Sequence, residues 1–178
     1  MAAIPQLEIV YYVAASLDGF IATADGGIDW LAPFENTGED YGYGEFYASV
    51  EAVLMGRKTY EQCLQFPEWP YAGKPYWVFS ASNGNTPSRV AAELKARGLR
   101  RAWLVGGGKL AAAFRAEGLI TEHIVSVIPV LLGAGIALFD GPGRGESLEL
   151  VSSKAYANGI VQLRYRVQPS ASPSAGAE

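Results

Sequence analysis

The stretch RAWLVGGGKLAAAFRAEG at residues 101–118 decides how the chain is expected to fold. Its apolar first part, Ala102 to Val105, is typical of a buried strand, and three consecutive glycines follow it. The next residues favour a helix that ends at Gly118. Glycine allows backbone angles that other residues avoid, and a helix start presents unpaired N–H groups and the positive end of its dipole. Such a turn predicts either a phosphate site or a tight turn without a ligand.

A second turn of this kind occurs earlier, in VLMGRKTYE at residues 53–61. Gly56 stands between a short apolar strand and a helix, and Arg57, Lys58 and Thr59 add two positive charges and a hydroxyl. A solvated basic pair also explains this pattern, but two such turns at one end of a sheet predict a ligand with several phosphates, such as a dinucleotide. The chain has no Walker pattern and no Gly-x-Gly-x-x-Gly after its first strand, which argues against a P-loop enzyme and a standard Rossmann domain.

The rest of the chain alternates between strand and helix patterns. Strands are expected at 7–15, 52–55, 76–80, 102–105, 121–130, 136–139, 147–156 and 160–167, and helices at 40–50, 56–64, 87–97 and from the three glycines to 118. This order predicts a three-layer α/β fold, a mainly parallel mixed sheet with helices on both faces and an antiparallel C-terminal edge. We expect one domain at 1–167 and a disordered, low-complexity tail at 168–178.

Composition narrows the class of protein. The 178 residues carry a formal net charge of −4, and the 14 Lys and Arg are scattered, so we expect no nucleic-acid partner. Cys63 is the single cysteine and is expected to be a small apolar helix residue, so no intrachain disulfide forms. The start lacks the pattern of a signal peptide, and no apolar run is long enough for a membrane helix. We therefore expect a cytoplasmic protein without a membrane partner.

Several segments resemble a known superfamily. MGRKTYE at 55–61 is similar to MGRKTWE of dihydrofolate reductases, and VGGGK at 105–109 is similar to their IGGGR segment. YVAASLDGFIA at 12–22 and LITEHIVSVIPVLLGAGIALF at 119–139 resemble more closely the reductase domain of bacterial riboflavin biosynthesis and its small stand-alone relatives. The resemblance covers about residues 7–167 and implies an NADPH-dependent reductase that acts on a small heterocycle, of pterin or ribosylated pyrimidine type.

The resemblance also implies which residues bind NADPH. By position they are Ala14, Gly56, Arg57, Lys58, Thr59, Ser80, Gly106, Gly107, Gly108 and Lys109. Arg57 and Lys109 stand where such enzymes hold the extra phosphate of NADPH. The family often has an arginine just after the strand that ends near Ser80, whereas Ala81 and Ser82 follow here, so the preference for NADPH over NADH stays open. The stand-alone relatives usually pair, so we expect a homodimer, with Trp69, Tyr71 or the strand-rich end as its apolar interface.

A carboxylate on the first helix anchors the substrate in dihydrofolate reductases. Counting back from residues 55–59 points to Asp40 as this catalytic residue, and counting forward from Trp30, which resembles the tryptophan of the mobile loop, points to Glu35. We favour Asp40, with Glu35 and Glu39 as alternatives, although Asp40 is also suited to cap its helix. Trp30 and Tyr47 are expected to contact the substrate.

For the remaining polar side chains, the sequence predicts no catalytic role or leaves the role open. Asp18 either faces the cleft or shapes a turn, and His123, the single histidine, is expected to be structural. The chain has no cluster of cysteine and histidine for zinc and no Ser–His–acid arrangement. Two further hypotheses compete with the reductase: a non-catalytic nucleotide-binding protein that kept the fold, and a structural domain in which both glycine turns are empty.

Overall fold

The computed structural model describes residues 6–169 and contains a seven-stranded sheet in the order β4-β3-β5-β1-β6-β9-β8. Its strands are β1 (Glu8–Ser16), β3 (Ala52–Gly56), β4 (Tyr76–Phe79), β5 (Arg101–Gly106), β6 (Glu122–Ile128), β8 (Leu148–Ala155) and β9 (Val161–Val167). The short strands β2 (Phe20–Ala22) and β7 (Ile136–Ala137) form a separate antiparallel pair. The helices are the 3-10 helix η1 (Asp29–Phe34), α1 (Tyr43–Ser49), α2 (Arg57–Cys63), α3 (Pro87–Ala96) and α4 (Gly108–Ala116).

The sheet is mixed in the way that the element order predicts. Strands β4, β3, β5, β1 and β6 run parallel to their neighbours, whereas β9 is antiparallel to β6 and β8 is antiparallel to β9. The β8–β9 hairpin turns at Asn158 and Gly159, and Gly159 adopts the positive φ of +91° that this turn requires. The predicted fold class is therefore confirmed, including its antiparallel C-terminal edge.

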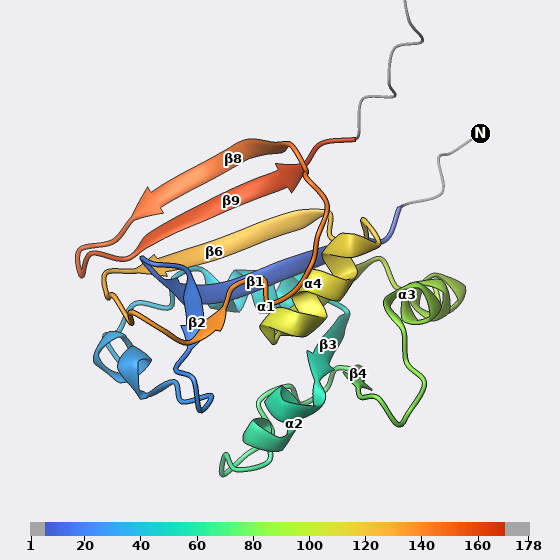
Figure 1. Ribbon diagram of the computed structural model, residues 1–178, viewed down its shortest axis with the longest axis horizontal. Helices are drawn as coiled ribbons and strands as arrows, with labels where there is room; N and C mark the ends of the chain where they lie inside the picture. Colours follow the sequence, from blue (N-terminus) through green and yellow to red (C-terminus); the bar gives the residue numbers. More distant parts are fainter. Residues whose placement is uncertain (1–5, 170–178) are drawn as a thin grey trace, which may run out of the picture.

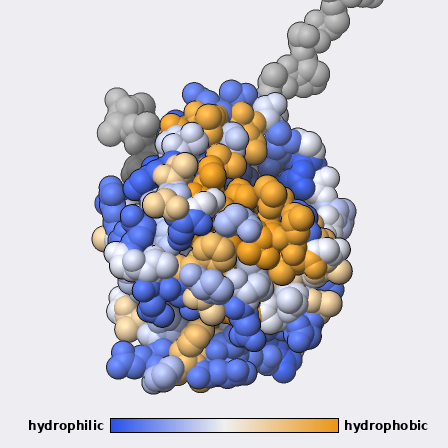
Figure 2. All heavy atoms as spheres, turned by 90° about the vertical axis from the view of Figure 1, so that its left-hand side faces the viewer, coloured by the Kyte–Doolittle hydropathy of each residue, from blue (hydrophilic) through white to orange (hydrophobic). Residues whose placement is uncertain are grey.

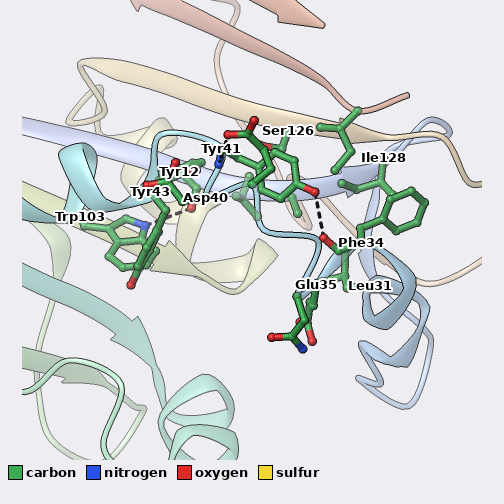
Figure 3. A pocket seen from close by; sticks show the side chains of 15 residues that line it. Tyr12, Leu31, Phe34, Glu35, Asp40, Tyr41, Tyr43, Trp103, Ser126 and Ile128 are labelled. Atoms are coloured by element: carbon green, nitrogen blue, oxygen red, sulfur yellow. Dashed lines mark hydrogen bonds between the residues drawn. The ribbon is translucent and has the colours of Figure 1, made fainter. Parts of the chain in front are cut away.

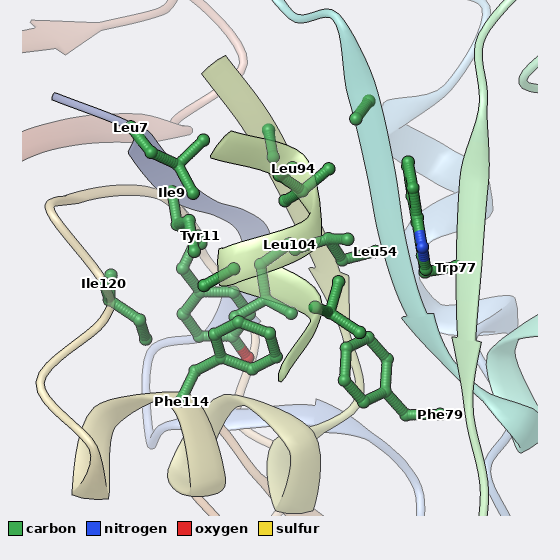
Figure 4. Close-up of a cluster of buried hydrophobic side chains, with 14 of the residues drawn as sticks. Leu7, Ile9, Tyr11, Leu54, Trp77, Phe79, Leu94, Leu104, Phe114 and Ile120 are labelled. Carbon is green, nitrogen blue, oxygen red and sulfur yellow. The ribbon is translucent and has the colours of Figure 1, made fainter. Parts of the chain in front are cut away.

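Helices cover both faces of the sheet (Figure 1). Along β5, successive side chains point to opposite faces, so Leu104 joins a buried cluster with Phe114 of α4, while Trp103 joins a cluster with Phe46 of α1. The first cluster also holds side chains of α3, and the second holds Cys63 of α2. Figure 4 shows Leu104 and Phe114 at the centre of the first cluster. Three layers result, with α3 and α4 on one side and α1 and α2 on the other.

The first helix is shorter than the sequence pattern predicts. We expected it from Asp40, but α1 begins at Tyr43. Tyr41 and Gly42 adopt left-handed backbone angles, with φ of +55° and +76°, and a right-handed helix cannot include them. The three residues before the helix therefore form a turn, and Asp40 lies in that turn rather than on the helix.

Asp18 fastens the loop after β1 to the loop after β6. Its carboxylate accepts hydrogen bonds from the Ser16 hydroxyl at 2.6 Å and from the backbone N–H groups of Leu132 at 3.1 Å and Gly133 at 2.7 Å. The hydrogen bond from Ser16 is the largest cause that holds the pKa of Asp18 below its ordinary value of 3.8. Of the two roles left open for Asp18, these contacts support the one in which it shapes the loops.

The C-terminal tail lies mostly outside the described residues. Residues 170–178 of the predicted disordered segment are not described. Gln168, at its start, donates its backbone N–H to the Ser147 carbonyl at 2.9 Å and so extends the pairing of the hairpin by one hydrogen bond.

The first prediction concerns the core. Leu104 is fully buried in the centre of the sheet, so Leu104→Ala leaves a cavity and is expected to lower the free energy of unfolding by about 2–5 kcal/mol. Leu64, 58% exposed, is the matched control, and Leu64→Ala should change stability by less than about 0.5 kcal/mol. Urea unfolding of both variants measures the difference, and equal losses would contradict the described core.

The second prediction concerns Asp18 and pH. Because its folded-state pKa is lowered, the Asp18 carboxylate stabilises the folded protein above its unfolded-state pKa, and this contribution is lost as the pH falls through the folded-state value. Asp18→Asn should therefore lower Tm at neutral pH, and the gap to the wild type should narrow in acid. Thermal unfolding across that range measures the gap, with Asp29→Asn as a control for the lost charge. A gap that is constant with pH would contradict the role of the ionised carboxylate.

Candidate functional site

The two glycine turns lie side by side at the carboxyl ends of neighbouring strands. Met55 of β3 pairs with Gly106 of β5, so Gly56 stands next to the second turn. A Cβ atom added to Gly56 would lie 3.7 Å from the Gly106 carbonyl oxygen and 3.8 Å from the Gly107 nitrogen. Ser80 follows β4, whose Phe79 pairs with Gly56 on the other side. Parallel pairing thus brings both turns and Ser80 to one rim of the sheet.

The helices that begin at this rim have no side-chain cap within the described part of the chain. Gly56 precedes α2 and Gly107 precedes α4, and neither helix start receives a hydrogen bond from a capping side chain. By contrast, Thr86 caps α3, where its hydroxyl oxygen accepts the N–H of Arg89 at 3.3 Å. The first-turn N–H groups of α2 and α4 are therefore open to an anion, which the helix dipole favours at this end.

The three consecutive glycines serve different purposes. Gly106 has a φ of +133°, which other residues rarely adopt, and a Cβ atom on Gly106 or Gly107 would meet nothing within 4 Å. A Cβ atom on Gly108 would instead collide with the Ala137 carbonyl oxygen, and the Gly108 carbonyl accepts the N–H of Asp140 at 3.2 Å. Gly106 and Gly107 therefore border open space, whereas Gly108 lets α4 pack against the segment after β7.

Positive side chains surround the rim. Arg57, Lys58 and Lys109 are exposed, and the Arg57 Nε donates to Glu61 one helical turn away at 2.7 Å. Thr59 is partly buried in α2, and the Ser80 hydroxyl lies 3.2 Å from that of Ser82. The cationic groups are thus free to reach a bound anion, although Arg57 has an acidic partner on its own helix.

A cleft of about 520 Å³ lies along β1, β5 and β6. Figure 3 shows the side chains around it. The cleft is lined by Tyr12, Val13, Ala14, Leu31, Phe34, Glu35, Asn36, Glu39, Asp40, Tyr41, Tyr43, Trp103, Ser126, Ile128 and Ile160. Five of these residues are aromatic. Trp103 is buried in the wall and donates its indole N–H to the Tyr12 carbonyl at 3.0 Å, and Tyr41 donates its hydroxyl to the Phe34 carbonyl at 3.0 Å, so several rings are held in place.

All three candidate carboxylates line the cleft. Asp40, Glu35 and Glu39 are exposed and stand at its edge. The two carboxylate oxygens of Asp40 accept the backbone N–H groups of Gly42 at 2.9 Å and Gly44 at 3.2 Å. These hydrogen bonds, the first from Gly42, hold the pKa of Asp40 below 3.8. Asp40 therefore caps the start of α1 and lines the cleft at the same time, as an ionised group at neutral pH.

A glutamine that the sequence analysis did not single out joins the polar groups of the cleft. The Gln162 side-chain amide on β9 donates to the Ser126 hydroxyl at 3.1 Å, the Tyr41 carbonyl at 3.2 Å and the Tyr12 hydroxyl at 3.3 Å. Burial raises the pKa of Tyr12 above its ordinary value of 10.0, so its phenol stays protonated. Ser126 in the apolar run of β6 pairs with Gln162 of β9, and the only signal of this network in the sequence is that both residues are polar within largely apolar strands.

Two expected substrate contacts lie outside the lining of the cleft. Trp30 belongs to η1, but Leu31 and Phe34 of that helix line the cleft instead, and the Trp30 indole N–H is buried without a hydrogen-bond partner in the described residues. Tyr47 donates its hydroxyl to the Ala72 carbonyl at 3.3 Å, and Tyr43, one turn earlier in α1, lines the cleft. Ala14, expected at the cofactor, also lines this cleft.

His123 lies away from the cleft, on the other face of the sheet. Its ring packs edge-on against Tyr11 and Phe139, with ring centroids 6.3 Å and 5.6 Å away, and burial lowers its pKa below 6.5. It borders a second cavity of about 360 Å³ between α4 and β9. Among residues 6–169, no group of three or more His, Cys, Asp and Glu side chains is placed to hold a metal ion. No helix there is long and apolar enough to cross a membrane.

Apolar side chains gather at one end of the molecule. Figure 2 shows this end, where the loop after β6 and the β8–β9 turn lie. Leu131 in the loop after β6 is 70% exposed, and Leu17, whose N–H donates to the Val130 carbonyl of that loop, is 66% exposed. Trp69 and Tyr71 were expected to offer an apolar interface, but Tyr71 is buried in the core and Trp69 packs edge-on against it at 5.6 Å. The Tyr71 ring belongs to the interior of the chain and Trp69 is partly buried against it, and the homodimer stays a prediction.

Known proteins share this fold and sequence. The family model described as "RibD C-terminal domain" matches residues 76–162. The chain is 40% identical to the uncharacterized protein YwjB of Bacillus subtilis (strain 168) over 172 residues, which covers 90% of this chain and 98% of that protein. A putative riboflavin biosynthesis protein from Shewanella sp. PV-4 superposes with a TM-score of 0.81 at 27% identity, over 92% of this chain and 100% of that one.

A longer protein shares the fold alone. The diaminohydroxyphosphoribosylaminopyrimidine deaminase/5-amino-6-(5-phosphoribosylamino)uracil reductase of Thermotoga maritima superposes with a TM-score of 0.68 at 14% identity, over 92% of this chain and 57% of that protein. The reductase-type fold that the resemblance implies thus recurs in proteins that share much or little of this sequence. By sequence and by structure, the chain belongs to the RibD C-terminal domain family.

Proposed function

We propose that this protein is an NADPH-dependent reductase that transfers hydride to a small heterocyclic substrate. One observation carries the proposal: two glycine turns with uncapped helix starts meet at a rim, and the strand that feeds one of them also lines an aromatic cleft. Trp103 and Gly106 are three residues apart on β5, which is about 10 Å in an extended strand. A dinucleotide is long enough to reach from the rim into the cleft.

The residues at the rim fit a cofactor with several phosphates. Gly56 to Thr59 and Gly106 to Lys109 offer open N–H groups and three exposed cations, and Ser80 adds a hydroxyl beside the first turn, on the side away from the second. Backbone N–H groups at a helix start and cationic side chains are the partners that phosphates prefer. The cofactor, when bound, supplies the hydride. Ala14, in the wall of the cleft, leaves room for a flat ring because its side chain is a single methyl group.

In the cleft, Asp40 is suited to orient the substrate rather than to donate a proton. Its lowered pKa keeps it ionised at neutral pH, so it accepts hydrogen bonds from N–H groups of a heterocycle or pairs with a cation. The raised pKa of Tyr12 keeps its hydroxyl protonated and able to donate. Glu35 and Glu39 are the alternatives to Asp40 at the same edge.

The competing function is a nucleotide-binding protein without catalysis, because the same rim would serve both. Titration of the full chain with NADPH and with NADH tests for binding in either case. Oxidation of the reduced nicotinamide with a heterocyclic substrate, followed by absorbance, is expected only of the reductase. Binding of neither dinucleotide would contradict both functions.

The third prediction tests the rim by filling it. Gly107 has a negative φ of −84°, and an added Cβ atom meets nothing within 4 Å, so Gly107→Val should fold normally and occupy the space next to the helix start. We expect NADPH to bind roughly 10- to 100-fold more weakly, as for the loss of one or two hydrogen bonds to a charged group. Gly145→Val, at another open glycine, is the matched control. Calorimetry measures the affinity, and unchanged binding would contradict the rim as the phosphate site.

The fourth prediction tests the assignment of the extra phosphate of NADPH to Lys109. Lys109→Gln removes an exposed charge at the start of α4, and it should weaken NADPH binding roughly tenfold while NADH binding changes little. Lys95→Gln, which removes an exposed charge from the last turn of α3, should change neither affinity. Equal weakening of both dinucleotides would place Lys109 at the shared pyrophosphate instead.

A further inference from the structure

We propose that the cleft takes a planar nitrogen heterocycle that is neutral or cationic and carries no phosphate group. The inference rests on the proposed reductase function and narrows its substrate class. The inference is based on where the charged groups lie. The cations and open N–H groups that suit a phosphate are at the glycine rim, whereas carboxylates border the cleft.

The walls of the cleft suit a flat ring. Trp103 lies with its ring centroid 5.8 Å from that of Tyr43 and 6.0 Å from that of Tyr12, so three aromatic side chains form one connected surface. The volume of about 520 Å³ falls in the range of small-molecule sites. Aromatic walls with a few fixed polar groups bind the faces of a heterocycle and read its edge by hydrogen bonds.

The charged groups around the cleft are mostly negative. Asp40, Glu35 and Glu39 line it, and no lysine or arginine is among the lining residues in the described part of the chain. The positive charge of Lys154 contributes to the lowered pKa of Asp40, and the Lys154 ammonium group lies 4.5 Å from the centre of the Tyr156 ring. Three carboxylates therefore border the cleft, and the amine that acts on one of them is already packed on an aromatic ring.

The N-terminus of α1, which lies at the cleft, is also unfavourable for binding a phosphate. The N-terminus of α1 would offer N–H groups to an anion, but the Asp40 carboxylate already accepts those of Gly42 and Gly44. These hydrogen bonds occupy two donors at the helix start and place a negative charge where a phosphate would bind. The glycine rim differs, because α2 and α4 have no side-chain cap there.

This substrate class differs from the one in the name of the Thermotoga maritima protein, which is a reductase of a phosphoribosylated aminouracil. That protein shares the fold with this chain at 14% identity, so its substrate does not transfer by similarity. The charges around the cleft favour the ring without the phosphate.

The test compares two compounds that differ in one phosphate: 5-amino-6-(ribosylamino)uracil and its 5′-phosphate. Binding to the full chain is measured by calorimetry and by quenching of tryptophan fluorescence, since Trp103 lines the cleft. We expect the compound without phosphate to bind at least about tenfold more tightly, because like charges repel across a binding site. Equal or tighter binding of the phosphorylated compound would overturn the proposal, and so would binding of neither.

Variants attribute the discrimination to the carboxylates. Glu35→Gln with Glu39→Gln should reduce the discrimination severalfold, and adding Asp40→Asn should reduce it further. The double variant leaves the cap of α1 intact, so it stays informative if the triple variant is less stable. A control with Glu68→Gln, Glu93→Gln and Glu149→Gln changes the net charge equally outside the cleft and should keep the full discrimination. Equal effects of the two triple variants would contradict the assignment.

Measuring with and without NADPH separates this proposal from the reductase function. Discrimination against the phosphate without any NADPH binding would overturn the reductase function and leave the substrate class standing. NADPH binding together with a preference for the phosphorylated compound would overturn the substrate class alone.

Discussion

The parallel pairing of β3 with β5 is the constraint on which the rest of the site depends. It sets Gly56 beside Gly106 at the same end of the sheet, so that two helices start next to each other. A side chain in place of either glycine would fill the space between the turns or demand a backbone angle that it rarely adopts. The five parallel strands give the sheet a single carboxyl rim, and the parallel order therefore fixes where a ligand can bind.

Helix capping distinguishes the glycine rim from the aromatic cleft. Thr86 accepts a backbone N–H at the start of α3, and Asp40 accepts two at the start of α1, whereas α2 and α4 have no side-chain cap at the rim. A helix start attracts anions only while its N–H groups are unsatisfied. At the rim, the dipoles of α2 and α4 are available to a phosphate. At the cleft, the dipole of α1 stabilises the ionised Asp40 carboxylate instead. The same physical effect therefore favours an anionic ligand at the rim and disfavours one at the cleft.

The sequence predicted the succession of strands and helices along the chain and the two glycine turns well, because both depend on local patterns. Apolar runs identify strands, and glycine at a strand end identifies a turn, whatever the rest of the chain does. The cleft was harder, because its lining comes from loops and from side chains that meet only in the folded protein. Tyr43 lines the cleft and Tyr47 does not, although both lie on one face of α1 a single turn apart, and an apolar period does not distinguish two such positions. Gln162 reaches Tyr12 across β6 only through the register of β9 on β6, which no local pattern specifies.

The hydrogen bonds of Asp40 show that capping α1 and facing the cleft are compatible roles, which the sequence could not decide. Capping a helix and orienting a substrate looked like alternatives, but a carboxylate has more acceptor positions than the two N–H groups of Gly42 and Gly44 require. The cap also fixes the side chain and lowers its pKa, and both effects favour a group that orients a ligand. Glu39 accepts one backbone N–H, that of Tyr41 at 3.2 Å, whereas Asp40 accepts two, and Glu35 accepts none from the described residues, which is the physical reason to place Asp40 before both glutamates. The structural role of Asp40 is therefore part of what suits it to a functional one.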